Sequence, residues 1–174
     1  EKLKMKLSND TREVLKNFST INQNLMVKNG TAIGTMSAMK NIVAKATVPD
    51  TFNNEFAIYD LNEFLNVINL VDEPRLRFEK DYVVVTDKTG RSAVKYHFSD
   101  PEMLTSPGNA INMPEAEVKF TLDSATLDKV KKAASALGHD EIAITPTQGA
   151  VKISVVDSED ATSNTFSIDV EGVY

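Results

Sequence analysis

The chain carries LSNDTREVLKNFSTI at residues 7–21 and LDSATLDKVKKAASAL at residues 122–137, and the two runs share one pattern. Each has a residue that caps helices, Ser8 or Asp123, at its second position and continues with apolar side chains at helical spacing. In both runs a threonine stands three positions after the cap and a lysine stands eight positions after it. We predict an equivalent amphipathic helix at each place and, from the elements around them, an internal duplication.

Strand patterns follow these two helices in the same order. The runs cover residues 24–28, 31–36 and 41–48 in the first copy and residues 141–145, 150–156 and 163–170 in the second. Only the first copy continues, through a second helix that begins near Asp60 and carries Phe64 and Ile68 inward, to strands that end at Phe98. This order also occurs in unrelated folds. We predict an α+β fold of repeated β-α-β-β-β units, with helices on one face of antiparallel sheets and an incomplete second copy.

Residues 99–117 separate the two copies and follow neither the helical nor the strand period. Three prolines and a glycine interrupt this segment, which is too long for an ordinary hairpin connection. We interpret it as an interdomain connection. The predicted organisation is a first domain at residues 1–100, a linker at residues 101–117 and the N-terminal part of a second domain at residues 118–174.

Charge is distributed unevenly along the chain. The formal net charge is −6, yet residues 1–48 contain eight basic and three acidic side chains, whereas the remainder contains 11 basic and 22 acidic ones. The first part can therefore approach a polyanion that the rest repels. Asymmetry of this size also occurs in proteins that never contact nucleic acid, so charge alone leaves both interpretations open.

The sequence offers no set of residues for catalysis, for a metal or for a cofactor. Cysteine is absent, and His97 and His139 lack a second histidine at ligand spacing. No glycine cluster of a nucleotide-binding loop occurs, and we interpret the acidic run at residues 157–160 as a solvated turn. No apolar run is long enough to cross a bilayer and the start lacks a secretory signal, so we expect a cytosolic protein. Because no catalytic set is found, we also expect the protein to be non-catalytic.

The outward faces of the predicted helices carry cations and amides. In the first helix, Arg12 and Lys16 lie opposite the apolar stripe. The matching face of residues 122–137 carries Lys129, Lys131 and Lys132, and the second helix exposes Asn62, Asn66 and Asn69. Such faces can make weak, sequence-independent contacts with phosphates, although an ordinary solvated helix face is the alternative.

Four segments of the chain resemble the DNA polymerase sliding clamp of T4-like bacteriophages. They are MKLS at residues 5–8, LKNFSTIN at residues 15–22, MVKNG at residues 26–30 and AIYDLNEFL at residues 57–65. The match is dense to about residue 72 and looser beyond it. The resemblance implies a DNA-clamp fold with two similar domains per subunit, in a homotrimeric head-to-tail ring whose helices line the hole around double-stranded DNA.

In that family the ring is placed on DNA by an ATP-driven clamp loader and tethers the replicative DNA polymerase for processive synthesis. It also contacts the late-transcription machinery. The resemblance therefore implies these partners, no cofactor, no membrane contact and a location in the cytoplasm of the infected bacterial host. A closed ring stays on DNA without strong phosphate binding, which suits a negatively charged chain. The alternative function is that of a non-catalytic β-rich phage structural or interaction protein.

The resemblance also assigns roles to particular residues. Those expected to face DNA are Arg12, Lys16, Lys129, Lys131 and Lys132, with Lys4 and Lys6 as further candidates. A partner-binding pocket beneath the linker is expected to involve Met36, Met39, Ile111, Met113 and Pro114. The alternative for these apolar residues is that they pack the linker onto a sheet.

Two features depart from the family pattern. Residues 1–4 precede the usual start, and the family's second domain would continue with a fourth helix and more strands. We therefore expect an uncovered apolar sheet face within residues 118–174. The sheet edges through which a ring would have to close are expected at residues 91–98 and 163–170.

Overall fold

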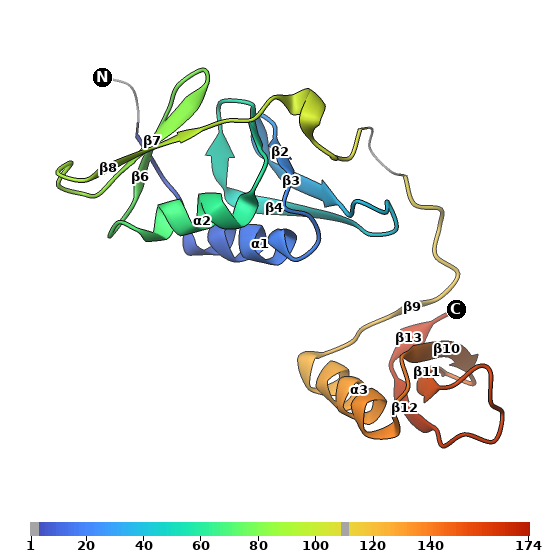
Figure 1. The fold of residues 1–174 in the computed structure, drawn as a ribbon. Helices are drawn as coiled ribbons and strands as arrows, with labels where there is room; N and C mark the ends of the chain where they lie inside the picture. The colour runs from blue at the N-terminus through green and yellow to red at the C-terminus, as the bar shows by residue number, and fades with distance from the viewer. Residues whose placement is uncertain (1–3, 109–111) are drawn as a thin grey trace. The chain divides into compact units, whose positions relative to one another are not determined.

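The computed structural model describes residues 4–108 and 112–174 (Figure 1). Contacts divide the chain into two compact units, Glu1–Ala110 and Ile111–Tyr174, here named unit 1 and unit 2. Each unit combines helices with antiparallel strands, which confirms the predicted α+β class.

Helix α1 (Asn9–Ser19) begins where the sequence predicted it. Ser8 is the N-cap, and its Oγ accepts a hydrogen bond from the backbone N–H of Thr11 at 3.2 Å. Leu15 and Phe18 are buried, whereas Lys16 is exposed. The helix therefore turns its apolar stripe to the core and leaves a polar face outside.

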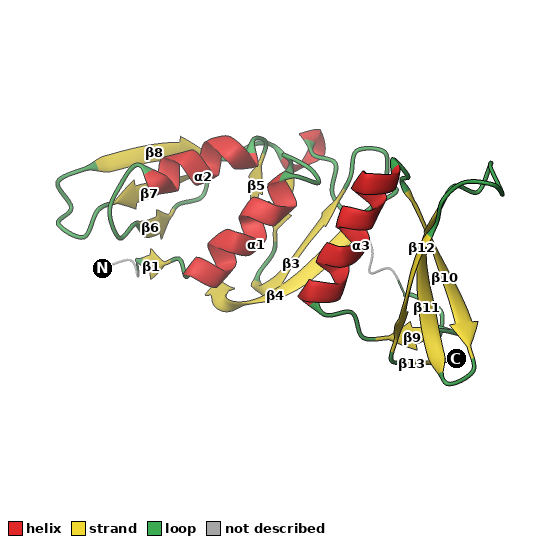
Figure 2. Ribbon diagram, turned by 90° about the horizontal axis from the view of Figure 1, so that it is seen from below, coloured by secondary structure: helices red, strands yellow, loops and turns green. Residues whose placement is uncertain are grey.

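Helix α2 (Leu61–Asn69) packs against α1 on one side of the strands of unit 1 (Figure 2). Its N-cap is Asp60, whose side chain accepts a hydrogen bond from the backbone N–H of Glu63 at 3.0 Å. Phe64 and Ile68 are buried beneath the strands. The two helices thus form a layer, with their polar faces directed away from the core.

The described strands of unit 1 pair antiparallel in three small sheets. The largest contains, in order, β1 (Met5–Lys6), β6 (Arg75–Phe78), β7 (Tyr82–Thr86) and β8 (Ala93–His97). The other two pair β2 (Leu25–Val27) with β5 (Phe56–Ile58) and β3 (Gly30–Met36) with β4 (Val43–Phe52). Helices on one face of antiparallel sheets are the arrangement that the sequence predicted.

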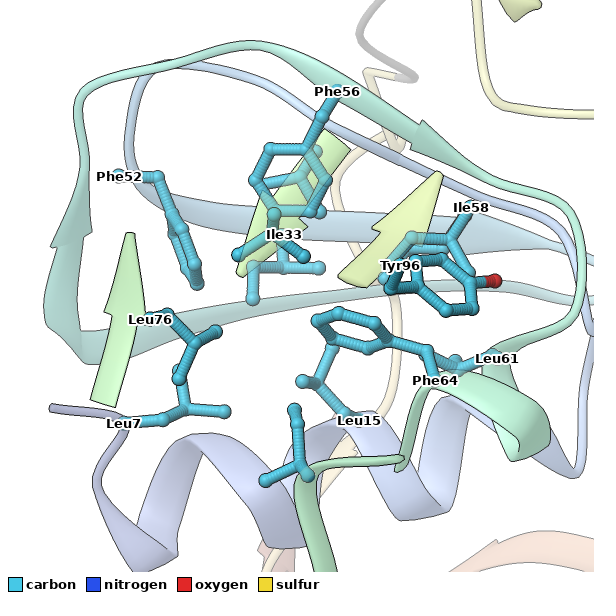
Figure 3. Close-up of a cluster of buried hydrophobic side chains, with 14 of the residues drawn as sticks. Leu7, Leu15, Ile33, Phe52, Phe56, Ile58, Leu61, Phe64, Leu76 and Tyr96 are labelled. Carbon is cyan, nitrogen blue, oxygen red and sulfur yellow. The ribbon is translucent and has the colours of Figure 1, made fainter. Parts of the chain in front are cut away.

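One hydrophobic core joins both helices to the strands of unit 1 (Figure 3). The ring centroid of Phe56 lies 5.0 Å from that of Phe78 and 5.0 Å from that of Phe98. Phe64 of α2 packs against Tyr96 of β8 with ring centroids 5.3 Å apart. Aromatic side chains remove large apolar areas from water, so this core holds the helix layer firmly on the strands.

Unit 2 is built around helix α3 (Ser124–Leu137). Asp123 caps it by accepting a hydrogen bond from the Thr126 N–H at 2.6 Å, and Gly138 ends it with a left-handed φ of 68°. The strands β10 (Glu141–Thr147), β11 (Ala150–Val156) and β12 (Phe166–Val170) form an antiparallel sheet. A helix followed by three strands repeats the order of α1, β2, β3 and β4, as the internal duplication predicted.

A short strand pair joins the segment before α3 to the segment after β12. β9 (Lys119–Phe120) precedes α3 and pairs with β13 (Gly172–Val173), which follows β12. A β-carbon at Gly172 would meet Val151 Cγ2 at 2.6 Å and the carbonyl oxygen of Lys119 at 2.7 Å. Glycine therefore permits the close approach of these strands.

The core of unit 2 is smaller and leaves apolar side chains exposed. Val130 of α3 packs with Ile153 and Val155 of β11. On β10, Ile142 is 51% exposed and Ile144 is 49% exposed. Two helices pack on the strands of unit 1, whereas unit 2 has one described helix. The uncovered apolar positions expected from the sequence are thus found on β10.

Candidate nucleic-acid interface

A groove of about 530 Å³ lies between α1 and α2. Its lining combines side chains of both helices: Asn9, Arg12, Glu13 and Lys16 from α1 with Asn62, Leu65, Asn66 and Asn69 from α2. Only Leu65 among them is apolar. The polar faces that the sequence predicted for the two helices therefore meet in one groove.

Arg12 and Lys16 supply the positive charge of the groove. Arg12 is half-buried, and its Nε has no hydrogen-bond partner among the described residues. Lys16 follows about one turn later and is exposed. The Nε atom itself is buried, so a phosphate oxygen could be bound only by the terminal N–H groups of the guanidinium. The lysine adds a mobile charge beside it.

The opposite wall carries three amide side chains, Asn62, Asn66 and Asn69, all exposed. Each amide can donate and accept hydrogen bonds, so this wall can contact phosphate or sugar oxygens without adding charge. Contacts of this kind carry no information about base sequence. The groove can therefore follow a nucleic-acid backbone of any sequence.

Two further groove residues, Asn9 and Glu13, were not selected from the sequence. With Arg12 and Lys16 they occupy one face of α1, at positions i, i+3, i+4 and i+7. That spacing is the signal that could have found them. The carboxylate of Glu13 also lowers the net positive charge of the groove, which favours loose contact with phosphates over tight binding.

The three α3 lysines that were predicted to face DNA, Lys129, Lys131 and Lys132, are all exposed. Their helix buries Val130 against the strands of unit 2. The structure thus gathers Arg12 and Lys16 in a groove of unit 1 and the three lysines on one helix of unit 2. Use of both sets by one DNA duplex stays a prediction.

The residues of the predicted partner-binding pocket belong to two different units. Met36, at the end of β3, is half-buried, and Met39, in the turn that follows, is 85% exposed. In unit 2, Met113 is 82% exposed and Pro114 is exposed. Ile111 lies outside the described residues. A common pocket therefore stays a prediction.

Asp50 of β4 fixes the start of α1. Its Oδ2 accepts hydrogen bonds from the backbone N–H and the hydroxyl of Ser8, at 2.8 and 2.7 Å, and from the hydroxyl of Thr11. Burial alone raises the pKa of Asp50, but the hydrogen bonds from Thr11 and Ser8 outweigh it, and the pKa falls below its ordinary value of 3.8. The carboxylate thereby orients the turn of α1 that carries Arg12.

Replacement of Asp50 by alanine is expected to lower the free energy of unfolding by about 2 kcal/mol, because the buried hydroxyl of Thr11 loses its acceptor. The folded-state pKa of Asp50 lies below that of the unfolded chain. Its stabilisation is therefore complete above the unfolded pKa and is lost as the pH falls through the folded pKa. The difference in stability between parent and variant should shrink below about pH 4.

Urea unfolding followed by tyrosine fluorescence measures this difference. Three of the four tyrosines, Tyr59, Tyr82 and Tyr96, belong to unit 1 and report on it. Asp72→Ala removes an exposed carboxylate and is the matched control. If Asp50→Ala lowers the free energy of unfolding equally at every pH, the charge of Asp50 does not contribute to this stabilisation.

The described residues hold no group of three or more histidines, cysteines or carboxylates that could bind a metal ion. Within the same residues, no helix has the length and apolar character needed to span a membrane.

Comparison with known proteins gives one family. A family model described as DNA polymerase processivity factor matches residues 8–104. The sliding clamp of Vibrio phage KVP40 is 35% identical over 171 residues, which cover 95% of this chain and 77% of that protein. The sliding clamp of Enterobacteria phage T4 is 32% identical over 150 residues, which cover 86% of this chain and 66% of that protein. The chain thus spans about two thirds to three quarters of the length of these relatives.

A solved structure resembles the chain in fold. The beta chain of DNA polymerase III from Streptococcus pneumoniae matches with a TM-score of 0.53 at 12% sequence identity. The match covers 98% of this chain and 48% of that one. At this identity the likeness bears on the fold alone, and it agrees with the fold class predicted from the sequence.

Proposed function

Because the chain belongs to the DNA polymerase processivity factors, the family of the sliding clamps of T4-like phages, we propose that it encircles duplex DNA and tethers a DNA polymerase. The observation that carries the proposal is the groove between α1 and α2, which presents two cations and three asparagine amides. Such groups suit movement along a duplex, because each contact with the phosphate backbone is weak and independent of sequence.

Enclosure reconciles the net charge of −6 with a polyanionic partner. A closed ring stays on DNA because of its topology, so the groove needs only to accommodate the duplex and does not have to bind it tightly. The acidic remainder of the chain then disfavours contact of DNA with the outer surface. A protein that bound DNA by charge alone would need a much more basic composition.

We further propose that three identical chains join head to tail and that an ATP-driven clamp loader places the ring on DNA. β8 and β12 are edge strands of their sheets and can pair with a neighbouring chain. The exposed side chains of Met39 and Met113 suit adaptable apolar contacts with the polymerase and with the late-transcription machinery. In this proposal the protein is non-catalytic and works in the cytoplasm of the infected host.

Primer extension on a circular template, with the polymerase and clamp loader of a T4-like phage, tests the proposal. The chain is expected to lengthen the products of single polymerase binding events, and a linear template with free ends is the control. Native mass spectrometry is expected to show an assembly of three 19.1 kDa chains. Unchanged product lengths with a strictly monomeric chain would favour the rival function, a β-rich structural or interaction protein.

A further inference from the structure

The turn between α1 and β2 contains three consecutive polar residues, Asn22, Gln23 and Asn24, and all are half-buried. The side chain of Gln23 contacts both helices of the groove. The side chains of Asn22 and Asn24 instead reach the segment that follows β8. The Nδ2 of Asn22 also donates to the carbonyl oxygen of Met36, at the end of β3, at 2.8 Å. One short turn thus touches three separate parts of unit 1.

Gln23 caps α2 from outside that helix. Its carbonyl oxygen accepts a hydrogen bond from the Leu61 N–H at 2.8 Å, and its Oε1 accepts one from the Asn62 N–H at 3.0 Å. Its Nε2 donates to the carbonyl oxygen of Ser19, at the end of α1, at 2.9 Å. The first amides of a helix have no acceptor within the helix. Gln23 therefore satisfies the start of α2 and ties it to the end of α1.

Asn22 and Asn24 hold the segment of residues 99–107, here named the strap. The Nδ2 of Asn22 donates to the carbonyl oxygen of Thr105 at 3.1 Å, and the Oδ1 of Asn24 accepts from the Thr105 N–H at 3.2 Å. Side chains thus bind both backbone groups of Thr105, as a neighbouring strand would. At its start, the strap is held by a hydrogen bond of 2.9 Å from the Ser99 N–H to the backbone of β5.

Asn24 connects the strap directly to α2. Its Nδ2 donates to the carbonyl oxygen of Tyr59 at 2.7 Å. Tyr59 immediately precedes Asp60, the N-cap of α2. Within the turn, the Asn24 N–H donates to the Oδ1 of Asn22 at 2.9 Å. Release of Thr105 would therefore remove a restraint from Asn24 and, through Tyr59, from the cap of α2.

From these contacts we propose that the turn of residues 22–24 makes the position of the strap and the spacing of α1 and α2 depend on each other. Gln23 is a positioning residue for the groove, and release of the strap loosens the end of α2 at which Asn62 begins the amide wall. The inference rests on the proposed function in one respect: a ligand that moves the strap alters the contact of the groove with DNA.

Hydrogen exchange of the whole chain, without DNA, tests the proposal. Thr105→Pro removes the N–H that Asn24 binds, and Leu104, with φ −95° and ψ 146°, already has the extended backbone that precedes proline. Thr105→Ala keeps both backbone groups and is the matched control. Relative to that control, Thr105→Pro is expected to make the first amides of α2 exchange about fivefold faster, the effect of one lost hydrogen bond. Faster exchange confined to the strap would overturn the proposal.

A second set of variants decides the matter if Thr105→Pro fails to fold. Asn24→Ala removes the bonds to Thr105 and to Tyr59, so it should expose both the strap and the start of α2 to exchange. The proposal is wrong if Asn24→Ala affects the strap alone. Gln23→Glu keeps an acceptor for the Asn62 N–H and should retain protection that Gln23→Ala loses. Primer extension tests the proposed clamp function independently. Failure of the coupling between strap and groove can therefore be distinguished from failure of the proposed function.

Discussion

Charge reversal at both cations of the groove, Arg12→Glu together with Lys16→Glu, is expected to weaken binding of a short DNA duplex roughly tenfold to a hundredfold at low salt. Each substitution removes a contact with phosphate and places a carboxylate in the groove, so lost attraction and new repulsion add. Two lost contacts should also reduce the slope of log affinity against log salt concentration by about 2. Titration of a labelled duplex across a salt series measures both quantities.

The matched control reverses Lys45 and Arg91, which are exposed in unit 1 and do not line the groove. It changes the net charge by the same amount. Equal weakening by the two double variants would mean that overall charge, and not the groove, governs binding. Asn66→Ala, on the opposite wall, removes an uncharged group and should weaken binding without a change in the salt slope.

Substitution of Gly172 by alanine is expected to lower the stability of unit 2 by about 2–3 kcal/mol. The new methyl group would lie 2.6 Å from a side-chain carbon of Val151 and 2.7 Å from the carbonyl oxygen of Lys119. A side chain can turn aside, but a backbone carbonyl can move only with its strand, so β9 and β13 must separate. Hydrogen exchange should show faster exchange in both strands of this pair, while the strands of unit 1 keep their protection.

Gly108→Ala is the control for the Gly172 substitution, since a β-carbon at Gly108 would meet no atom within 4 Å. It should leave exchange and thermal unfolding unchanged. Retained protection of Lys119 and Phe120 in the Gly172→Ala variant would mean that β9 and β13 tolerate a side chain between them. The close approach described for this pair would then be wrong.

The helices were predictable because their signals are local. Ser8, Asp60 and Asp123 stand directly before the helices that they cap, and each accepts a hydrogen bond from the amide three positions later, as their spacing predicted. The apolar stripes followed from the helical period for the same reason. The polar residues of each groove wall could be predicted for each helix separately. The helical period of either helix does not indicate that the two polar faces lie opposite each other.

Contacts between distant residues were not predictable, because they leave no period in the sequence. Asp50 binds Ser8 across 42 positions, and Thr105 binds Asn24 across 81. The segment interpreted as a linker contains a turn of 3-10 helix, η1 (Pro101–Met103), and is held to unit 1 at Thr105. The strand expected from residue 163 begins at Phe166, after a turn in which the carboxylate of Asp160 binds Thr162.

The pairing of β9 with β13 sets an order of events during translation. The ribosome synthesises β9 and α3 before Gly172 and Val173, so β9 stays unpaired until β13 has been synthesised. Unit 1 already has its core residues and its strap by then, and it can fold as it emerges. At about 5–20 residues per second, β9 therefore stays without its partner for roughly 3–10 seconds.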